Sequence, residues 1–241
     1  FQHGAFSKYT IGWIYCGYGR ENIIKPDMLY VWGSYWKNEL IRLGTYFDEN
    51  EVGFGGDPKT LKDFKFEEKN KADDEFIWLL MPYEIEAPKN EVREYVYQIL
   101  KCPSVKFVFK TRSDASDKSQ VVEYGFKKDM PSNFLVMSSV SQDIMDKVSM
   151  VIGTHSTYLY EVLHQLKPVY ILKTSLDYAE VMNQNGLADY IDLNENVCQK
   201  INQAKDIDLN ILRQRRDKFY KDFGSLEKIL KNLFYVRDKW L

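Results

Sequence analysis

The stretch SMVIGTHSTYLYEVLHQLKPVYIL, residues 149–172, decides the class of fold. It opens with an apolar run, passes through Gly153 and several hydroxyl residues, continues with apolar residues at helical spacing and closes on a second apolar run. A buried strand that leads through a short turn into a helix and then into another buried strand is the repeating unit of a parallel sheet. The stretch therefore predicts an α/β fold with a Rossmann-like parallel sheet.

The same alternation extends over most of the chain from Asp74 onward. Apolar runs predict strands, and amphipathic segments between them predict crossover helices. The expected strands are 75–82, 104–110, 132–139, 149–153, 167–172 and 188–193, and the expected helices are 88–101, 141–148, 157–166 and 176–186. Apolar residues recur at three and four residues over 226–234, which predicts further helix in the C-terminal tail.

The first part of the chain is organised differently. A strand over 27–33 precedes a helix over 34–44, with Ser34 as its N-cap and Gly44 as its stop, and a short strand lies at 50–57. The lysine-rich segment after it has little to bury and predicts a linker. We therefore expect a partial N-terminal α/β domain over 1–57, a linker over 58–73 and a Rossmann-like domain with C-terminal helices over 74–241. The sequence begins directly with FQHGAF, without a polar segment ahead of it. We therefore also expect a missing N-terminal part of the same protein.

Composition excludes several classes of protein. The 241 residues are 44% apolar with a net charge of −2, which gives no reason to expect nucleic acid as a partner. No run approaches the roughly 18 apolar residues that a membrane-spanning helix needs. Cysteines are odd in number and far apart, at positions 16, 102 and 198. This spacing predicts unpaired thiols in a reducing compartment.

The turn inside the opening stretch has the composition of an anion site. Gly153, Thr154, His155, Ser156 and Thr157 lie where a strand passes into a helix, and a helix N-terminus attracts phosphate through its unpaired N–H groups. One turn further along, Glu161 is placed to accept a hydrogen bond from a ribose hydroxyl. The alternative interpretation is structural: Ser156 or Thr157 only caps the helix, and Glu161 closes a capping box.

Two other places carry candidate chemistry. His3 follows an expected strand end and is a candidate general acid/base or phosphate ligand, with an ordinary loop histidine as the alternative. Lys110 and Arg112 leave the end of a strand on one face, a pair of cations suited to a phosphate, although exposed strand-end cations are common. Metal-ligand spacing is absent, and neither dinucleotide nor P-loop signatures occur, so we expect no metal and no cofactor.

Taken in order, FQHG, KPDMLYVWGSYWKNELIRLG, NEVGFGGDP, FVFKTRSD and VIGTHSTYLYEVLHQLKPVYIL resemble GT-B-type glycosyltransferases of bacterial capsule and lipopolysaccharide synthesis. The resemblance is nearest to Kdo transferases and teichoic-acid-like polymerases. It implies two Rossmann-like domains facing a cleft, with the nucleotide-sugar donor on the C-terminal domain and the acceptor on the N-terminal one. It also implies that His3 contacts the donor phosphate or assists catalysis, that Ser156 and Thr157 hold the phosphate, and that Glu161 holds the ribose.

Departures from that family narrow the expected function. Polymerases of polyol phosphates carry HGTPLK and a KPHP-like strand end, where this chain has HGAFSKY and KTRSD, so sugar transfer is favoured. We expect a metal-independent transferase that moves a sugar from a CMP- or UDP-linked donor to a bacterial glycan or glycolipid. The resemblance implies a cytoplasmic protein with peripheral association at the inner face of the membrane. A nucleotide-sugar epimerase and a non-catalytic nucleotide-binding module are the alternatives.

Overall fold

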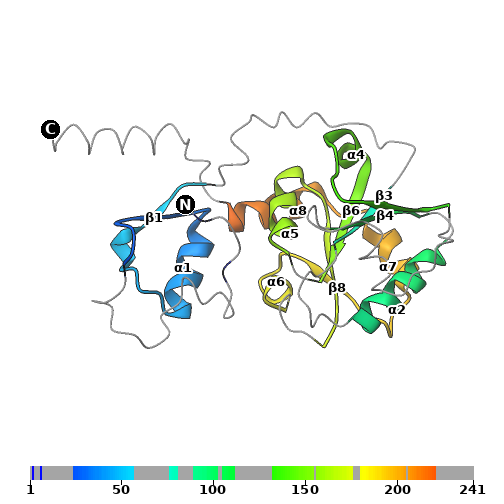
Figure 1. Cartoon of the computed structure of the whole chain (residues 1–241), viewed down its shortest axis with the longest axis horizontal. Helices are drawn as coiled ribbons and strands as arrows, with labels where there is room; N and C mark the ends of the chain where they lie inside the picture. The colour runs from blue at the N-terminus through cyan, green and yellow to red at the C-terminus, as the bar shows by residue number, and fades with distance from the viewer. Residues whose placement is uncertain are drawn as a thin grey trace. The chain divides into compact units, whose positions relative to one another are not determined.

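A computed structural model describes residues 2, 6, 24–56, 76–80, 89–102, 105–111, 132–154, 156–175, 180–204 and 206–220 (Figure 1). The chain divides into two compact units, Phe1–Lys65 with Gln214–Leu241, and Phe66–Arg213. This division groups the chain from Gln214 onward with the first unit, whereas the sequence predicts it in the second. The predicted linker, 58–73, lies outside the described residues.

The second unit contains a six-stranded sheet in which every pairing is parallel. Its strands are β3 (Phe76–Leu80), β4 (Lys106–Lys110), β5 (Phe134–Met137), β6 (Val148–Gly153), β7 (Val169–Leu172) and β8 (Asp189–Ile191). Its helices are α2 (Lys89–Leu100), α4 (Gln142–Lys147), α5 (Thr157–Glu161), the 3-10 helix η4 (Val162–Gln165), α6 (Glu180–Gln184) and α7 (Val197–Ala204), and α8 (Leu209–Phe219) begins here. Each predicted strand and helix of this unit is confirmed.

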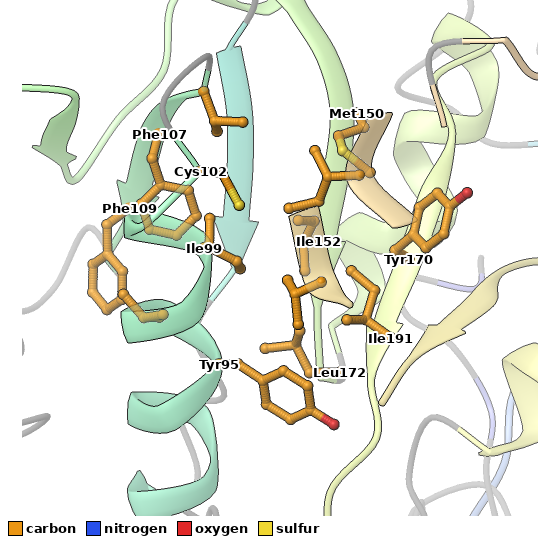
Figure 2. Close-up of a cluster of buried hydrophobic side chains, with 14 of the residues drawn as sticks. Tyr95, Ile99, Cys102, Phe107, Phe109, Met150, Ile152, Tyr170, Leu172 and Ile191 are labelled. Carbon is orange, nitrogen blue, oxygen red and sulfur yellow. The ribbon is translucent and has the colours of Figure 1, made fainter. Parts of the chain in front are cut away.

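Helices cover both faces of this sheet, as Figure 1 shows for α2 and α7 on one side and α5 on the other. The face under α2 and α7 holds a continuous buried cluster, and Figure 2 shows Tyr95 and Ile99 of α2 directed toward Ile152 and Leu172 of the sheet. Alternate residues of the same strands, such as Val151, are buried on the opposite face. Because both faces are covered, the central strands β6 and β7 are apolar along most of their length, which is why apolar runs predicted them.

Strand order identifies the functional edge of the sheet. The order is β5-β4-β3-β6-β7-β8, so the chain builds outward from β3 in one direction and then returns to add β6, β7 and β8 in the other. The topological switch point lies between β3 and β6. In open parallel sheets, ligands bind beside the carboxyl ends of the strands at this point.

The first unit is built around aromatic residues. Strands β1 (Leu29–Val31) and β2 (Val52–Phe54) pair in parallel, with α1 (Ser34–Leu43) and the 3-10 helix η2 (Glu49–Glu51) between them. Trp32 and Trp36 are almost fully buried and meet edge to face at 5.3 Å between ring centroids. The last residues of the described chain join them: Tyr220 stacks on Trp32 at 5.5 Å and Phe219 lies 6.0 Å from Trp36. This packing is why the end of α8 groups with the first unit.

The helix ends of α1 correct one prediction and confirm another. The N-cap is Gly33 rather than Ser34, which is the first helical residue, and no side chain caps this end. The predicted stop at Gly44 is confirmed, because Gly44 adopts a left-handed φ of 84° that favours glycine. The predicted end of the helix over 176–186 is confirmed in the same way, because Gly186 has a left-handed φ of 69°.

The prediction of unpaired thiols is wrong for two of the three cysteines. Cys102 and Cys198 form a disulfide, with 5.5 Å between their Cα atoms. They are 96 residues apart in the chain, and the packing of α2 against α7 brings them together. Cys16 lies outside the described residues. Separately, none of the helices described in the structure is both long and apolar enough to cross a membrane.

Candidate functional site

The candidate site lies at the carboxyl edge of the sheet, at its switch point. Sheet register places Lys110 at the end of β4 level with Leu80 of β3, and Leu80 level with Gly153 at the end of β6. Two inter-strand spacings separate Lys110 from Gly153, a distance of about 10 Å between their backbones. The turn that predicts the fold therefore leaves the sheet where a ligand is expected, and α5 begins directly after it.

Gly153 is required for the packing of this turn. A Cβ atom added to Gly153 would lie 2.9 Å from Cδ2 of Leu159, a distance that real Cβ contacts do not reach. Leu159 is fully buried and lies on α5, which packs against β6. The glycine thus allows α5 to start immediately above the strand end, which brings the backbone of the turn close to the switch point.

Thr154, the next residue, carries the observation that most favours a ligand. Its side chain is buried, with 5% of the residue exposed, and its Oγ1 atom finds no hydrogen-bond partner in the part of the chain that the structure describes. A buried hydroxyl without a partner destabilises a fold by about 1–3 kcal/mol. Such a group at a switch point is a candidate hydrogen-bond donor to a bound molecule.

Ser156 confirms half of the structural interpretation of this turn. It is the N-cap of α5, and its Oγ accepts a hydrogen bond from the backbone N–H of Tyr158 at 3.2 Å. The expected capping box is wrong, because the third helical residue is Leu159 and Glu161 is the fifth. Thr157 is the first residue of the helix, so its side chain lies at the positive end of α5.

Glu161 and Tyr158 lie near each other on α5. Burial raises the pKa of the Tyr158 hydroxyl above its ordinary value, and the negative charge of Glu161 raises it further. Tyr158 therefore stays protonated and remains a hydrogen-bond donor at neutral pH. Glu161 itself is partly exposed, as a group that accepts a hydrogen bond from a ligand must be.

Lys110 is the one predicted cation whose position the structure describes. Its Nζ donates to the backbone carbonyl of Thr111 at 3.0 Å, which folds the side chain back over the end of β4. Its predicted partner Arg112 lies outside the described residues, as do His3 and His155. The structure thus gathers Gly153, Thr154, Ser156, Thr157 and Glu161 at one turn and places Lys110 on the same edge.

Sequence reasoning missed the polar contacts that hold the loop after β7. Lys173 donates to Asp192 at 3.0 Å, and Glu91 accepts from both the backbone N–H and the hydroxyl of Ser175, at 2.7 and 2.6 Å. The backbone N–H of Asn194, followed by Lys173, lowers the pKa of Asp192 below its ordinary value. Lys173 and Asp192 directly follow the apolar runs of β7 and β8, a position that could have marked them.

Over the described ranges, no three His, Cys, Asp or Glu side chains are grouped as a metal ion would require.

Many solved structures resemble the chain, and three of them are described here. UDP-GlcNAc 2-epimerase of Methanocaldococcus jannaschii, in complex with UDP-GlcNAc and UDP, has a TM-score of 0.62 at 15% identity over 87% of this chain and 61% of its own. MnaA of S. aureus, in a co-structure with UDP, gives 0.58 at 14% identity over 88% and 60%. A single-substitution variant of the wall teichoic acid polymerase TagF gives 0.56 at 13% identity over 88% and 58%.

These likenesses establish the fold. The chain has a GT-B-like α/β fold, with a Rossmann-like parallel sheet preceded by part of a second α/β unit, as predicted. It spans roughly three fifths of the length of the structures that it matches. No family model matches the sequence, and no curated protein matches it either.

Proposed function

We propose that this chain is the nucleotide-sugar-binding part of a metal-independent glycosyltransferase that extends a bacterial surface glycan. The observation that carries the proposal is the buried hydroxyl of Thr154 at the switch point of a parallel sheet, which has no hydrogen-bond partner among the described residues. A phosphate oxygen of the donor accepts the hydrogen bond that this hydroxyl lacks. The positive end of α5 and the side chain of Thr157 add to the attraction.

The chemistry follows from where negative charge develops. When the sugar leaves its donor, the bond between the anomeric carbon and the phosphate oxygen breaks, and the nucleotide carries away the electron pair. The α5 terminus, Lys110 and Arg112 stabilise that charge, while Glu161 holds the ribose. An acceptor hydroxyl forms the new bond to the anomeric carbon and gives its proton to a base, for which His3 is the candidate.

The proposal also includes the identity of the donor nucleotide and of the acceptor. Two of the resembling structures contain UDP by their descriptions, which supports a UDP-linked donor over a CMP-linked one. The capsule or lipopolysaccharide acceptor, the kinship with Kdo transferases and the peripheral association with the inner face of the membrane rest on the sequence resemblance alone.

Replacement of Thr154 by valine tests the proposal directly, because valine has the same shape and no hydroxyl. We expect the variant to bind UDP or CMP about 10- to 100-fold more weakly by isothermal titration calorimetry, since a hydrogen bond to a charged group contributes about 1.5–3 kcal/mol. The ligand-free variant should be at least as stable as the wild type in urea, because an unsatisfied buried group has been removed.

Thr45→Val is the matched control. Thr45 is also buried, at 2% exposure, but its hydroxyl accepts a hydrogen bond from the N–H of Phe47. This variant should lose stability and keep its nucleotide affinity. Equal nucleotide affinity in wild type and Thr154→Val, or no nucleotide binding by the wild type, would overturn the proposal.

Epimerisation of a nucleotide sugar is the second candidate, favoured by the M. jannaschii structure, which is an epimerase. Incubation with UDP-GlcNAc, followed by proton NMR, separates the two. An altered hexosamine without glycan extension supports the epimerase, and extension of an acceptor with release of UDP supports the transferase. Binding without either outcome indicates a non-catalytic nucleotide-binding module.

A further inference from the structure

The two cysteines of the disulfide lie in different surroundings. Cys102 follows the end of α2 and has only 2% of its surface exposed, and Figure 2 shows it in the buried cluster with Ile99 and Phe107. Cys198 is partly exposed and packs against the border of the same cluster. The disulfide therefore joins a cysteine of the core to a cysteine that is accessible from solvent.

The position of Cys198 in its helix favours the reactive form of a thiol. Cys198 is the second residue of α7, and the side-chain Oδ1 of Asn196 caps this end by accepting from the N–H of Gln199 at 3.0 Å. The positive end of a helix favours a thiolate, which is the nucleophilic form of cysteine, whereas apolar burial favours the protonated thiol. In the reduced protein, we therefore expect the thiolate at Cys198 and the neutral thiol at Cys102.

A polar hollow on the surface lies beside Cys198. Apart from this cysteine, the hollow is lined by four amide side chains and one carboxylate, those of Asn196, Gln199, Asn202, Gln203 and Asp206. Amide groups both donate and accept hydrogen bonds, so they suit a small polar reactant. A reactant that enters this hollow meets Cys198, whereas Cys102 lies in the core behind it.

The fold holds the two cysteines at bonding distance. Their Cα atoms are 5.5 Å apart, within the range of about 4.4–6.8 Å that a disulfide requires. Helices α2 and α7 also pack through apolar side chains, among them Ile99 of α2 and Ile201 of α7. Because this packing does not depend on the bond, the disulfide can open and close with little movement of either helix.

We propose that Cys198 and Cys102 form a reversible, oxidant-responsive pair, in which Cys198 reacts with a hydroperoxide and Cys102 closes the disulfide. The Cys198 thiolate attacks one peroxide oxygen, the O–O bond breaks, and the leaving oxygen takes up a proton. The Cys198 sulfur is thereby oxidised to a sulfenic acid, and the hydroperoxide is reduced to an alcohol, or to water in the case of hydrogen peroxide. This inference is independent of the proposed function.

Cys102 then completes the reaction. Its sulfur attacks the Cys198 sulfur, the S–O bond breaks, and the hydroxide leaves as water with the proton of the Cys102 thiol. A dithiol reverses the change: one of its sulfurs attacks Cys198 and releases Cys102 as a thiol, and its second sulfur then displaces Cys198 and closes the disulfide of the reductant.

Matched single-cysteine variants test which sulfur reacts with the oxidant. Cys16→Ser/Cys102→Ser leaves only Cys198, and Cys16→Ser/Cys198→Ser leaves only Cys102. Both proteins are treated with hydrogen peroxide and dimedone, which traps sulfenic acid, and the adduct is followed by mass spectrometry. We expect the adduct to form at least about 10-fold faster at Cys198, because thiolate fraction and access both favour it.

The same pair of variants provides the control in urea. Unfolding should bring the two rates close together, because the fold is what distinguishes the cysteines. Equal rates in the folded proteins, faster reaction at Cys102, or a ratio that urea leaves unchanged would each overturn the proposal.

A labelling experiment covers the case in which one variant does not fold. The Cys16→Ser protein keeps both cysteines; it is reduced, freed of reductant and given less than one equivalent of N-ethylmaleimide. Peptide mapping should then find most of the label on Cys198. Label shared equally between the two cysteines, or found mainly on Cys102, would overturn the proposal.

The reduced Cys16→Ser protein also tests the resolving role of Cys102. Hydrogen peroxide should make the folded monomer lighter by two hydrogen atoms, and dithiothreitol should restore both thiols without urea. A sulfenic or sulfinic acid that persists at Cys198 beside a free Cys102 would overturn this role. A bond that dithiothreitol opens only after unfolding would show that the pair is not reversible and would equally overturn the proposal.

Discussion

Two strand-to-helix turns of this molecule look alike in sequence and are built differently. At β1–α1, the strand end is satisfied by Gln2, the helix has a glycine N-cap, and the surroundings are tryptophan and other aromatic rings. At β6–α5, a serine caps the helix, and the hydroxyl of Thr154 is left buried without a partner among the described residues. The first turn is satisfied within the chain, whereas the second has a buried hydroxyl whose hydrogen bond, under the proposed function, a ligand completes.

Trp32 makes the contrast sharper. Its indole Nε1 is also buried with no hydrogen-bond partner in the described part of the chain. Its ring, however, is almost fully buried and stacks on Tyr220, and burial of so large a ring stabilises by more than the unpaired N–H destabilises. Threonine has no comparable apolar area, so the same deficit at Thr154 has no such compensation, and the proposed phosphate ligand would supply the missing hydrogen bond.

The largest loss of stability should come from disrupting the aromatic packing at the β1–α1 turn. Trp36 is completely buried, and Trp36→Ala should lower the free energy of unfolding by about 3–5 kcal/mol in urea titrations, because truncation of a buried aromatic leaves a large cavity. Ile211→Ala is the control, since Ile211 is 45% exposed and should change stability by less than about 0.5 kcal/mol. Equal losses in the two variants would contradict an aromatic core in the first unit.

Reduction of the disulfide should destabilise the second unit, because both cysteines belong to the unit that contains the β6–α5 turn. A cross-link that closes a loop of 96 residues typically stabilises by about 2–4 kcal/mol, mainly by restricting the unfolded chain. Dithiothreitol should lower the free energy of unfolding of wild type by that amount and leave Cys102→Ser/Cys198→Ser unaffected. Three reactive thiols in the unfolded, unreduced protein would contradict the pairing.

Because α5 lies close to the end of β6, a substitution at Gly153 should cause a smaller loss of stability. Gly153→Ala should destabilise by about 1–3 kcal/mol, because the added methyl group forces Leu159 to move. Leu159→Val, which shortens the contacting side chain, should reduce the further loss caused by Gly153→Ala in a double-mutant cycle. Strict additivity of the two changes would show that they do not share a contact.

The smallest predicted effect concerns pH. The Asn194 N–H and Lys173 lower the pKa of Asp192, so its contribution to stability is present above the unfolded-state pKa of about 3.9 and disappears as the pH falls through the lower folded value. Asp192→Asn should therefore be slightly less stable than wild type at pH 7 and equally stable near pH 2. A difference that is constant with pH would assign the effect to packing.

Sequence predicted the second unit well because its signals are local. The central strands β6 and β7 are buried almost throughout, and Gly186 ends a helix in a left-handed conformation that favours glycine. The turn at Gly153 was also recognised, although the packing of Leu159 behind it was not.

What sequence did not predict depends on residues far apart in the chain. The pairing of Cys102 with Cys198 and the grouping of Phe219 with Trp36 arise only when the topology brings distant segments together. The hydrogen bond from the N–H of Trp32 to Gln2 is equally non-local, since thirty residues separate the two. The unpaired hydroxyl of Thr154 is a property of the folded turn that no spacing rule reveals.

The measurement that tests the central claim most directly is a titration of UDP followed by the backbone amide resonances of the labelled protein. If the β6–α5 turn is the phosphate site, the largest shifts should fall on Gly153, Thr154 and the first residues of α5, and should shrink severalfold in Thr154→Val. Shifts confined to other parts of the chain, or equal shifts in the two proteins, would contradict the account.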